Sequence, residues 1–231
     1  LIGLSPVKKL VIEILSVSMI IFGCNSFISD FGGVFGLYSL PVYLAYPITL
    51  FTFIVVMNAY NLIDGLDGLA GGIGAVASLF FAAGFMIAGD VTMAVISAIT
   101  AFALLGYLLH NFYPANIFMG DSGSLTVGLL LSFQAVQFIN LGSSEVFANY
   151  FNPAAAIVLP VAVLSVPLYD TIRVFTKRIC EKRSPFSPGR DHVHHELLSM
   201  GFNQPQVAVI LYLNTILVGL AGILLSGFLN I

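Results

Sequence analysis

Carboxylate and amide side chains recur every three residues in the segment NAYNLIDGLDGLAGG, which follows an uncharged apolar run. They are Asn58, Asn61, Asp64 and Asp67. In a helical or 3₁₀ turn, neighbours in such a series lie on adjoining faces, so the segment predicts a strip of oxygen ligands at a helix end. The alternative is an N-cap with packing glycines for the next helix, but a cap needs one acid rather than two acids and two amides.

A second polar segment, HNFYPANIFMGDSGS, contains Asn111, Asn116, Phe118 and Asp121. Pro114 predicts the end of one helix, and GDSGS predicts the start of another. Asp121 could cap that helix or hold a ligand, and the segment alone favours neither. Exposed N–H groups at such a helix start could also receive a phosphate.

The third segment, EKRSPFSPGRDHVHHELLSMGF, is the one long polar loop of the sequence. It carries three basic residues and three histidines: Lys182, Arg183, Arg190, His192, His194 and His195. The basic residues suit phosphate, although they could instead be only a membrane-topology signal. The histidines could hydrogen-bond phosphate, transfer protons or bind zinc. Zinc is the weaker choice, because no Cys is among them and HVHH lacks the i, i+4 spacing of a helical zinc pair.

The ligand types of the first two segments predict the metal. Oxygen ligands without thiolate favour a hard cation, so Mg²⁺ is expected, with Mn²⁺ as the alternative. A hard cation beside arginine and histidine indicates a pyrophosphate substrate, because the charge to be held is large.

The elements that must position these segments are membrane helices. Of the 231 residues, 58% are hydrophobic and only 8% are charged, whereas a soluble domain carries roughly 25% charged residues. The fold class is therefore all-α, a polytopic helix bundle forming one transmembrane domain over residues 1–231. Seven apolar stretches are each near the ~20 residues needed to cross a bilayer. They cover about 7–27, 42–60, 69–88, 91–110, 123–140, 154–174 and 206–228.

The basic residues predict the orientation. If the seven spans alternate, all eight Lys and Arg residues fall on one side, which the positive-inside rule makes cytoplasmic. The segments at about 58–68, 110–122 and 175–204 lie on that side, so the chemistry converges on one face. Cys24 and Cys180 fall on opposite sides, which makes a disulfide between them unlikely. A net charge of −3 and the lack of a basic arm give no indication of nucleic acid.

Together the three segments resemble the polyprenyl-phosphate N-acetylhexosamine-1-phosphate transferase family, the glycosyltransferase 4 type of bacterial membranes. NAYNLIDGLDGLAGG and NFYPANIFMGDSGS look like its second and third aspartate motifs, and RDHVHH looks like its histidine motif. They occur in the family order. The loop SPFSPGRDHVHHELL is more similar to the undecaprenyl-phosphate GlcNAc-1-phosphate type than to the phospho-MurNAc-pentapeptide type, which is the alternative.

The resemblance implies a role for each matching residue. It implies that Asn61 and Asp121 hold Mg²⁺ and that Asp64 and Asp67 are catalytic carboxylates. It implies that uracil is bound by Asn111 through a hydrogen bond and by Phe118 through stacking. The residues implied to contact the diphosphate and sugar are Arg190, His192, His194 and His195.

The chain departs from the family at its start. The family carries a further aspartate pair before a helix like the one at 7–27, and ten or eleven spans, whereas this sequence begins at Leu1 without such a pair. The expectation is a fragment lacking about four helices, so the inferred activity belongs to the intact protein.

The expected activity is transfer of HexNAc-1-phosphate, GlcNAc-1-phosphate in the first instance, from a UDP-sugar to undecaprenyl phosphate in the bacterial inner membrane. UMP would be released, and cell-envelope polysaccharide synthesis would begin, for example that of O-antigen. A homodimer is possible. The competing classes are a membrane transporter, whose acids would lie nearer the bilayer midplane, and a structural scaffold.

Overall fold

The computed structural model describes residues 6–36, 38–185, 187, 189 and 191–226, which form a bundle of helices. Within those residues there is no β-strand, only one isolated bridge between Asp30 and Ser39. The helices are α1 (Pro6–Gly23), η1 (Val34–Gly36), α2 (Val42–Leu62), α3 (Leu69–Ile87), α4 (Val91–Asn111), α5 (Gly120–Ile139), η2 (Asn140–Ser143), α6 (Glu145–Ala148), α7 (Ala155–Val163), α8 (Ser165–Cys180), α9 (Val193–Ser199) and α10 (Gln204–Ser226). The all-α prediction is confirmed.

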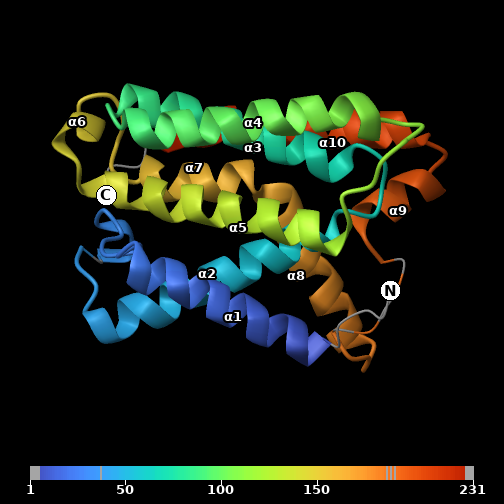
Figure 1. Ribbon diagram of the computed structural model, residues 1–231, viewed down its shortest axis with the longest axis horizontal. Helices are drawn as coiled ribbons and strands as arrows, with labels where there is room; N and C mark the ends of the chain where they lie inside the picture. The colour runs from blue at the N-terminus through green and yellow to red at the C-terminus, as the bar shows by residue number, and fades with distance from the viewer. Residues whose placement is uncertain (1–5, 37, 186, 188, 190, 227–231) are drawn as a thin grey trace.

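The long helices run side by side along the longest axis of the molecule (Figure 1). α3 lies against α4 and α10, α5 lies between this layer and α2, and α1 covers α2 from outside. The α2–α3 and α4–α5 connections and α9 lie at one end of the bundle, while α6 lies at the other. This chain order brings the three polar segments of the sequence to the same end.

Five described helices are long and apolar enough to cross a membrane, namely α2, α3, α4, α5 with η2, and α10. A sixth is counted if the bent pair α7 and α8 forms one span. The described residues thus hold five or six candidate spans, where about seven were expected. The difference is α1, which is helical as expected but carries Lys8, Lys9 and Glu13 among its 18 residues. The protein is a multi-pass membrane protein.

The span expected at 154–174 is not one straight helix. α7 and α8 meet at an angle of 70° around Leu164. Pro167 explains the break, because its ring lacks an N–H for the helical ladder and clashes with the carbonyl four residues earlier. α8 continues beyond the expected end to Cys180 and has one buried face, which includes Asp170 and Arg178. The break therefore turns a polar helix across the site end of the bundle.

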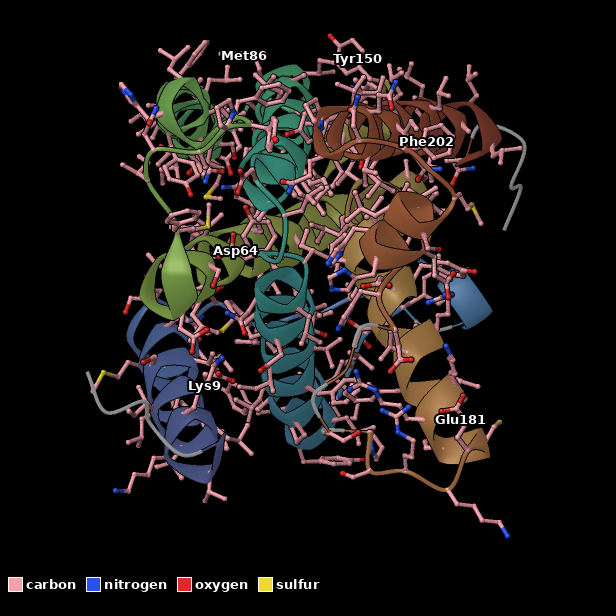
Figure 2. All side chains as sticks on the ribbon, turned by 90° about the vertical axis from the view of Figure 1, so that its right-hand side faces the viewer. Lys9, Asp64, Met86, Tyr150, Glu181 and Phe202 are labelled. Atoms are coloured by element: carbon pink, nitrogen blue, oxygen red, sulfur yellow. The ribbon has the colours of Figure 1, made fainter. Side chains whose placement is uncertain are left out.

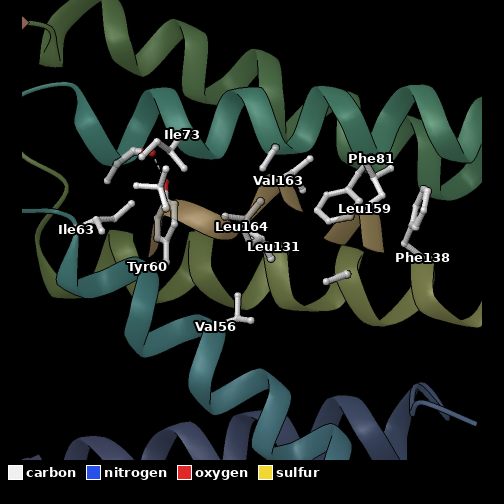
Figure 3. Close-up of a cluster of buried hydrophobic side chains, with 14 of the residues drawn as sticks. Val56, Tyr60, Ile63, Ile73, Phe81, Leu131, Phe138, Leu159, Val163 and Leu164 are labelled. Atoms are coloured by element: carbon white, nitrogen blue, oxygen red, sulfur yellow. Dashed lines mark hydrogen bonds between the residues drawn. The ribbon is translucent and has the colours of Figure 1, made fainter. Parts of the chain in front are cut away.

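The core of the bundle is a continuous apolar cluster that joins α2, α3, α5, α7 and α10 (Figure 3). At the end of the bundle that holds α6, Phe138 lies among the rings of Phe81, Phe85 and Phe147, with centroid separations of 5.2 to 5.7 Å. Toward the other end, the fully buried Tyr60 donates a hydrogen bond of 2.6 Å to the carbonyl oxygen of Ala70. The phenol thereby fixes the start of α3 against the end of α2, directly beneath the predicted ligand strip.

Candidate active site

The three predicted segments meet at one end of the bundle, which faces the viewer in Figure 2. In this view Lys9 lies below Asp64, and Phe202 and Glu181 lie to the right of Asp64. The contacts described below join residues that are up to 144 positions apart in sequence. The predicted convergence of the polar segments is thus found in the structure.

Neither aspartate segment uses its acids as helix caps. The N-cap of α3 is Gly68, at φ +79, and the N-cap of α5 is Met119; neither makes a side-chain capping bond. Asp121 lies within the first turn of α5, where the partial positive charge of the helix start favours an anion. The capping alternative does not account for Asp64, Asp67 or Asp121, which leaves them available for ligands or for holding loops.

Asn61 and Asp121 face each other across the ends of α2 and α5. The Nδ2 atom of Asn61 donates to Oδ1 of Asp121 at 3.1 Å and to Oγ of Ser124 at 2.6 Å. The Nζ atom of Lys9 lies 2.8 Å from Oδ1 of Asn61 and 3.7 Å from Oδ2 of Asp121. A cationic group therefore already lies between the two oxygens that the resemblance assigns to a metal ion.

Asn58, the first member of the three-residue series, points away from this cluster. Its Nδ2 atom donates to Glu13 of α1 at 2.6 Å and to the carbonyl oxygen of Ile54 at 2.9 Å. Asn58 and Glu13 therefore join α1 to α2 one turn below the Lys9–Asn61 contact. We call the group formed by Lys9, Asn61, Asp64 and Asp121 the aspartate site.

Asp64 is the half-buried acid of the aspartate site. Burial raises the pKa of its carboxyl to about 6, although a backbone hydrogen bond from Gly120 opposes the rise; the charge of Asp121 adds to it. A carboxyl with this pKa is mostly ionised at neutral pH but can accept a proton from a group of similar acidity. The environment of Asp64 therefore suits a general base.

Asp67 and Asn111 join the two loops to each other. Oδ2 of Asp67 accepts a hydrogen bond from the N–H of Ala115 at 3.1 Å. Oδ1 of the buried Asn111 accepts from the N–H of Gly68 at 3.0 Å, and its Nδ2 donates to the carbonyl oxygen of Ile117 at 2.8 Å. Both ends of the Asn111 amide are thus engaged by backbone, so Asn111 fixes the shape of the site in this structure.

A cavity of about 250 Å³ opens beside these acids. Residues 64–67, Asn111, Phe118 and Gly120 line it. The side chain of Phe118 is 76% exposed, so a face of its ring is available to stack on a flat ligand. The predicted uracil-contacting residues therefore lie at the same cavity as Asp64 and Asp67.

A tyrosine of α10 supports the loop from below. The Oη atom of Tyr212 donates a short hydrogen bond to the carbonyl oxygen of Gly68. Its ring passes so close to α3 that a Cβ atom on Gly72 would lie 2.0 Å from Cζ. Only glycine fits at position 72 without moving the phenol, which explains one of the glycines in the first segment.

The histidine segment, defined here as residues 191–195, leads into the first turn of α9. Nδ1 of His192 lies 2.7 Å from Oδ2 of Asp170. The rings of His192 and His194 stack at 5.6 Å, and those of His194 and His195 lie 4.3 Å apart. A Cβ atom on Gly65 would lie 3.0 Å from Nε2 of His194, so this ring borders the aspartate loop. Arg190, the fourth residue predicted here, lies outside the described residues.

The side chain of His194 is a neutral imidazole. It is only 2% exposed, and its Nε2 atom has no hydrogen-bond partner among the described residues. Burial lowers the pKa of His194 to about 4, with help from its neighbours His195 and His192. His194 can therefore offer a hydrogen bond at neutral pH but not a positive charge.

Asp191 gathers the basic residues of this region. Its carboxylate lies 3.1 Å from Nζ of Lys177, 3.3 Å from Nε of Arg178 and 3.6 Å from Nη2 of Arg183. The hydrogen bond from Lys177 in particular lowers the pKa of Asp191 below its usual range. Arg183, predicted as a phosphate ligand, is thus engaged by Asp191 and by Glu181 at 2.9 Å.

Comparison of the sequence with known proteins places the chain in a family. Residues 1–139, more than half of the chain, match the family described as glycosyl transferase family 4. The chain belongs to glycosyl transferase family 4. The resemblance carried by the three segments is thereby confirmed.

Curated relatives include two enzymes of undecaprenyl phosphate and one of decaprenyl phosphate. The chain is 33% identical over 185 residues to a probable undecaprenyl-phosphate N-acetylglucosaminyl 1-phosphate transferase of Bacillus subtilis, covering 80% of this chain and 49% of the relative. It is 39% identical over 176 residues to the decaprenyl-phosphate N-acetylglucosaminephosphotransferase of Mycobacterium tuberculosis, covering 72% and 44%.

For the undecaprenyl-phosphate alpha-N-acetylglucosaminyl 1-phosphate transferase of Escherichia coli O157:H7, the identity is 30% over 213 residues, covering 89% of this chain and 55% of the relative. The chain therefore spans about half the length of the curated relatives it matches.

Three residues of the site escaped the sequence analysis. Lys9 was interpreted only as an orientation signal, although its ammonium lies between Asn61 and Asp121. Asp170 lies inside an expected span, and an acid in that apolar stretch was the available signal. Tyr212 carries no such signal, because a tyrosine in a membrane helix is common and its contact with Gly68 is long-range.

Proposed function

We propose that the full-length protein transfers a HexNAc-1-phosphate from a UDP-sugar to a polyprenyl phosphate, with undecaprenyl phosphate as the acceptor and UMP as the leaving product. The observation that carries this proposal is the aspartate site. Oxygen atoms from the ends of α2 and α5 converge around one cationic group, beside a cavity bordered by an exposed aromatic ring. This arrangement suits a nucleotide diphosphate held through a cation.

The residues of the aspartate site fit Mg²⁺. Within the described residues no group of three or more His, Cys, Asp or Glu could hold a metal ion alone. Mg²⁺ nevertheless commonly takes one or two carboxylates and completes its shell with water and substrate phosphates. Asn61 and Asp121 would hold the ion through the oxygens that now face Lys9. Bound there, Mg²⁺ would neutralise charge on the diphosphate; Mn²⁺ offers the same chemistry.

The proposed reaction is a single exchange of P–O bonds. An oxygen of the lipid phosphate forms a bond to the β-phosphorus of the UDP-sugar. The bond from the β-phosphorus to the oxygen that bridges the two phosphates breaks, and UMP leaves with that oxygen. Lys9 would contact a phosphate oxygen of the bound diphosphate, because its side chain reaches both Asn61 and Asp121. The polyprenyl diphosphate sugar stays in the membrane.

Asp64 would receive the remaining proton of the lipid phosphate. The second pKa of a phosphate monoester is about 6, which matches the pKa of about 6 that burial gives Asp64. A proton transfer between groups of equal acidity needs little driving force. Asp67 would act by holding the 112–119 loop through Ala115 rather than by proton transfer.

GlcNAc is the proposed sugar because the three relatives described above are named as N-acetylglucosamine phosphotransferases. The starting step of cell-envelope polysaccharide synthesis is the role that follows for such a product. Phospho-MurNAc-pentapeptide transfer is the second candidate within the family.

A membrane orientation accompanies the proposal, with the aspartate site facing the cytoplasm of a bacterial inner membrane. The basic residues of α1 and α8 lie at the site end, which is the positive-inside pattern. Cys24 and Cys180 are both exposed. Cys24 follows α1 and Cys180 ends α8, and these two helix ends lie at opposite ends of the bundle. In intact spheroplasts, a membrane-impermeant maleimide should label a variant retaining only Cys24. It should label a variant retaining only Cys180 after permeabilisation alone; the reverse pattern would contradict this orientation.

The test of the function uses the full-length protein in detergent with undecaprenyl phosphate, Mg²⁺ and UDP-GlcNAc labelled with ³²P on the β-phosphorus. The expected result is label in the lipid fraction and unlabelled UMP in the aqueous fraction. Label that remains in UDP-GlcNAc, from a folded preparation and with UDP-MurNAc-pentapeptide also untouched, would contradict transfer. Substrate uptake into proteoliposomes without UMP release would instead support the transporter class.

A further inference from the structure

We propose that Asp170 is a positioning residue of the active site: it fixes the ring orientation and tautomer of His192 and the first turn of α9, and through them the placement of His194 against Gly65, which lines the cavity. This inference deepens the proposed function and rests on it for the identity of the substrate. Asp170 lies in α8, outside the aspartate and histidine motifs, so the proposal adds a new residue to the site.

Asp170 is a buried acid that points both of its oxygens into another element. Its side chain is 3% exposed, and its Oδ2 lies 2.7 Å from Nδ1 of His192. Its Oδ1 accepts a hydrogen bond of 2.8 Å from the backbone N–H of Val193, the first residue of α9. Two short bonds to one carboxylate offset the cost of burying it, and they fix both a side chain and a backbone.

The basic residues of α8 pair with acids other than Asp170, so His192 is the group that pairs with Asp170. Arg173 pairs with Glu196 and donates to the carbonyl oxygen of Asp191, while Lys177 and Arg178 pair with the carboxylate of Asp191. Among the described residues the ion-pair partner of Asp170 is His192. Asp170 is therefore dedicated to the histidine segment and is not one more member of the basic network.

The hydrogen bond determines which nitrogen of His192 carries the proton. An ionised carboxylate can only accept, so Nδ1 of His192 must be the N–H that faces Oδ2. In the neutral ring, Nε2 is then the nitrogen with the free lone pair. A carboxylate that fixes a histidine in this way sets both the direction of the ring and the atom available to a substrate.

The effect of Asp170 extends to the cavity through ring contacts. The ring of His192 stacks on His194 at an interplanar angle of 8°. His194 in turn brings Nε2 against Gly65, a residue that lines the cavity beside Asp64. A change in the orientation of His192 would move the surface on which His194 packs. The loss of Asp170 should therefore change the position of His194 beside the proposed diphosphate site.

The decisive variant is Asp170→Asn in the full-length protein, because it keeps the shape and both hydrogen bonds. The amide oxygen can still accept from the N–H of Val193, while the amide NH₂ must donate to Nδ1 of His192. The proton of His192 is thereby forced onto Nε2, so the variant reverses the tautomer while leaving the loop attached. A role in folding alone would not require the tautomer to matter.

Two readouts test the proposal. In ¹⁵N spectra of histidine-labelled protein, at a pH where imidazoles are neutral, the wild type should show one ring with Nδ1–H that becomes Nε2–H in Asp170→Asn. The value of kcat should fall by roughly 10- to 100-fold, the usual loss when a carboxylate that orients a histidine is changed, with a smaller change in KM for the UDP-sugar. Thr171→Val is the matched control, because among the described residues the Thr171 hydroxyl bonds to the carbonyl oxygen of Pro167 in its own helix; it should keep the wild-type kcat.

A double-mutant cycle keeps the proposal falsifiable if Asp170→Asn is poorly folded. In the His192→Ala background, Asp170→Asn should cost little further kcat, since its effect passes through His192. The four histidines of this chain are His110, His192, His194 and His195. A wild-type spectrum in which all four show Nε2–H would overturn the proposal without any variant. So would an unchanged kcat in folded Asp170→Asn. The spectra need no turnover, so a wild type inactive on every UDP-sugar would refute the proposed function and leave the tautomer result standing.

Discussion

The aspartate site and the histidine segment lie on either side of the Asp64–Gly65 loop, but their acids are used in opposite ways. In the aspartate site the side chain of Asp121 is 76% exposed and its one cationic neighbour among the described residues is the flexible Lys9. Around the histidine segment, Asp191 contacts three basic side chains and Asp170 is 3% exposed with both oxygens engaged. Acids of the first group are open to a ligand, whereas those of the second group hold protein to protein.

The difference indicates a division of labour within one site. An open carboxylate with a displaceable cation can exchange that cation for a metal ion and a phosphate at little structural cost. A paired and buried carboxylate cannot, because removing its partners would leave an uncompensated charge. Changes in the aspartate site should therefore reduce chemistry and leave the fold intact, and changes around the histidine segment should also loosen the loop.

The largest expected effect follows from Asp121→Ala. This change removes one of the two oxygens proposed to hold the cation, so Mg²⁺-dependent turnover in the full-length protein should fall by on the order of 10³-fold, as several kcal/mol of charge stabilisation is lost. Release of UMP is the measurement, and a wild-type thermal midpoint should accompany it. Glu145→Ala, at the opposite end of the bundle, is the control and should be silent. Normal turnover in Asp121→Ala would remove Asp121 from the metal site.

Compared with Asp121→Ala, Asp191→Ala should reduce turnover less but loosen the loop around the histidine segment more. It leaves Lys177, Arg178 and Arg183 without their shared partner, and breaking such a network is destabilising for its half-buried members. We expect faster trypsin cleavage after these basic residues and a raised KM for the UDP-sugar. Asp121→Ala should leave the cleavage rate unchanged. Equal cleavage rates in wild type and Asp191→Ala would contradict the proposed difference between the aspartate site and the histidine segment.

Gly72→Ala should act on stability and then on the aspartate site. The added methyl would lie 2.0 Å from Cζ of Tyr212, so the phenol must move and lose its bond to the carbonyl of Gly68. Overpacking of this kind costs roughly 1–3 kcal/mol. Gly106→Ala is the matched control, since its Cβ would meet no atom within 4 Å. A thermal midpoint for Gly72→Ala as high as that of Gly106→Ala would contradict the predicted packing.

The smallest effects are opposite pH dependences of stability. The pKa of Asp64 is raised to about 6, so its folded state binds the extra proton and stability falls as pH rises from about 4 to 6. The pKa of His194 is lowered to about 4, so the unfolded state binds the extra proton and stability falls as pH drops from 6.5 toward 4.

The two groups oppose each other in the wild type, and single variants should separate them. Asp64→Asn should give a thermal midpoint that rises with pH between about 4 and 6.5, and His194→Gln should give one that falls over the same range. Scanning calorimetry in detergent at several pH values is the measurement. Parallel curves for the two variants would show that burial does not shift these groups in opposite directions.

Much of this organisation could be predicted from sequence because it depends on local patterns. Apolar runs predicted the helices, and the placement of Lys and Arg predicted that the polar segments share one end. The spacing of Asn61, Asp64 and Asp67 predicted a ligand strip, and Asp121 was predicted to join it. The structure brings Asn61 and Asp121 within 3.1 Å.

The remainder depends on contacts between distant segments or on competing local effects. Pro167 was a sequence indication of the bend between α7 and α8, but the apolar run across the bend indicated one span. Asn111 has the amide of a substrate ligand, and only the folded loops show that backbone engages both of its ends. The Asp170–His192 pair joins residues 22 apart in sequence across a helix end, and no short motif records it.

The most direct test of the aspartate site is a Mn²⁺ titration followed by electron paramagnetic resonance, with the full-length protein and UDP-GlcNAc. We predict one saturable Mn²⁺ site, lost in Asp121→Ala and retained in Asp170→Asn, because the first residue is proposed to hold the cation and the second to position a histidine. Mn²⁺ binding that survives Asp121→Ala unchanged, or that is lost in Asp170→Asn instead, would contradict the division between the two regions.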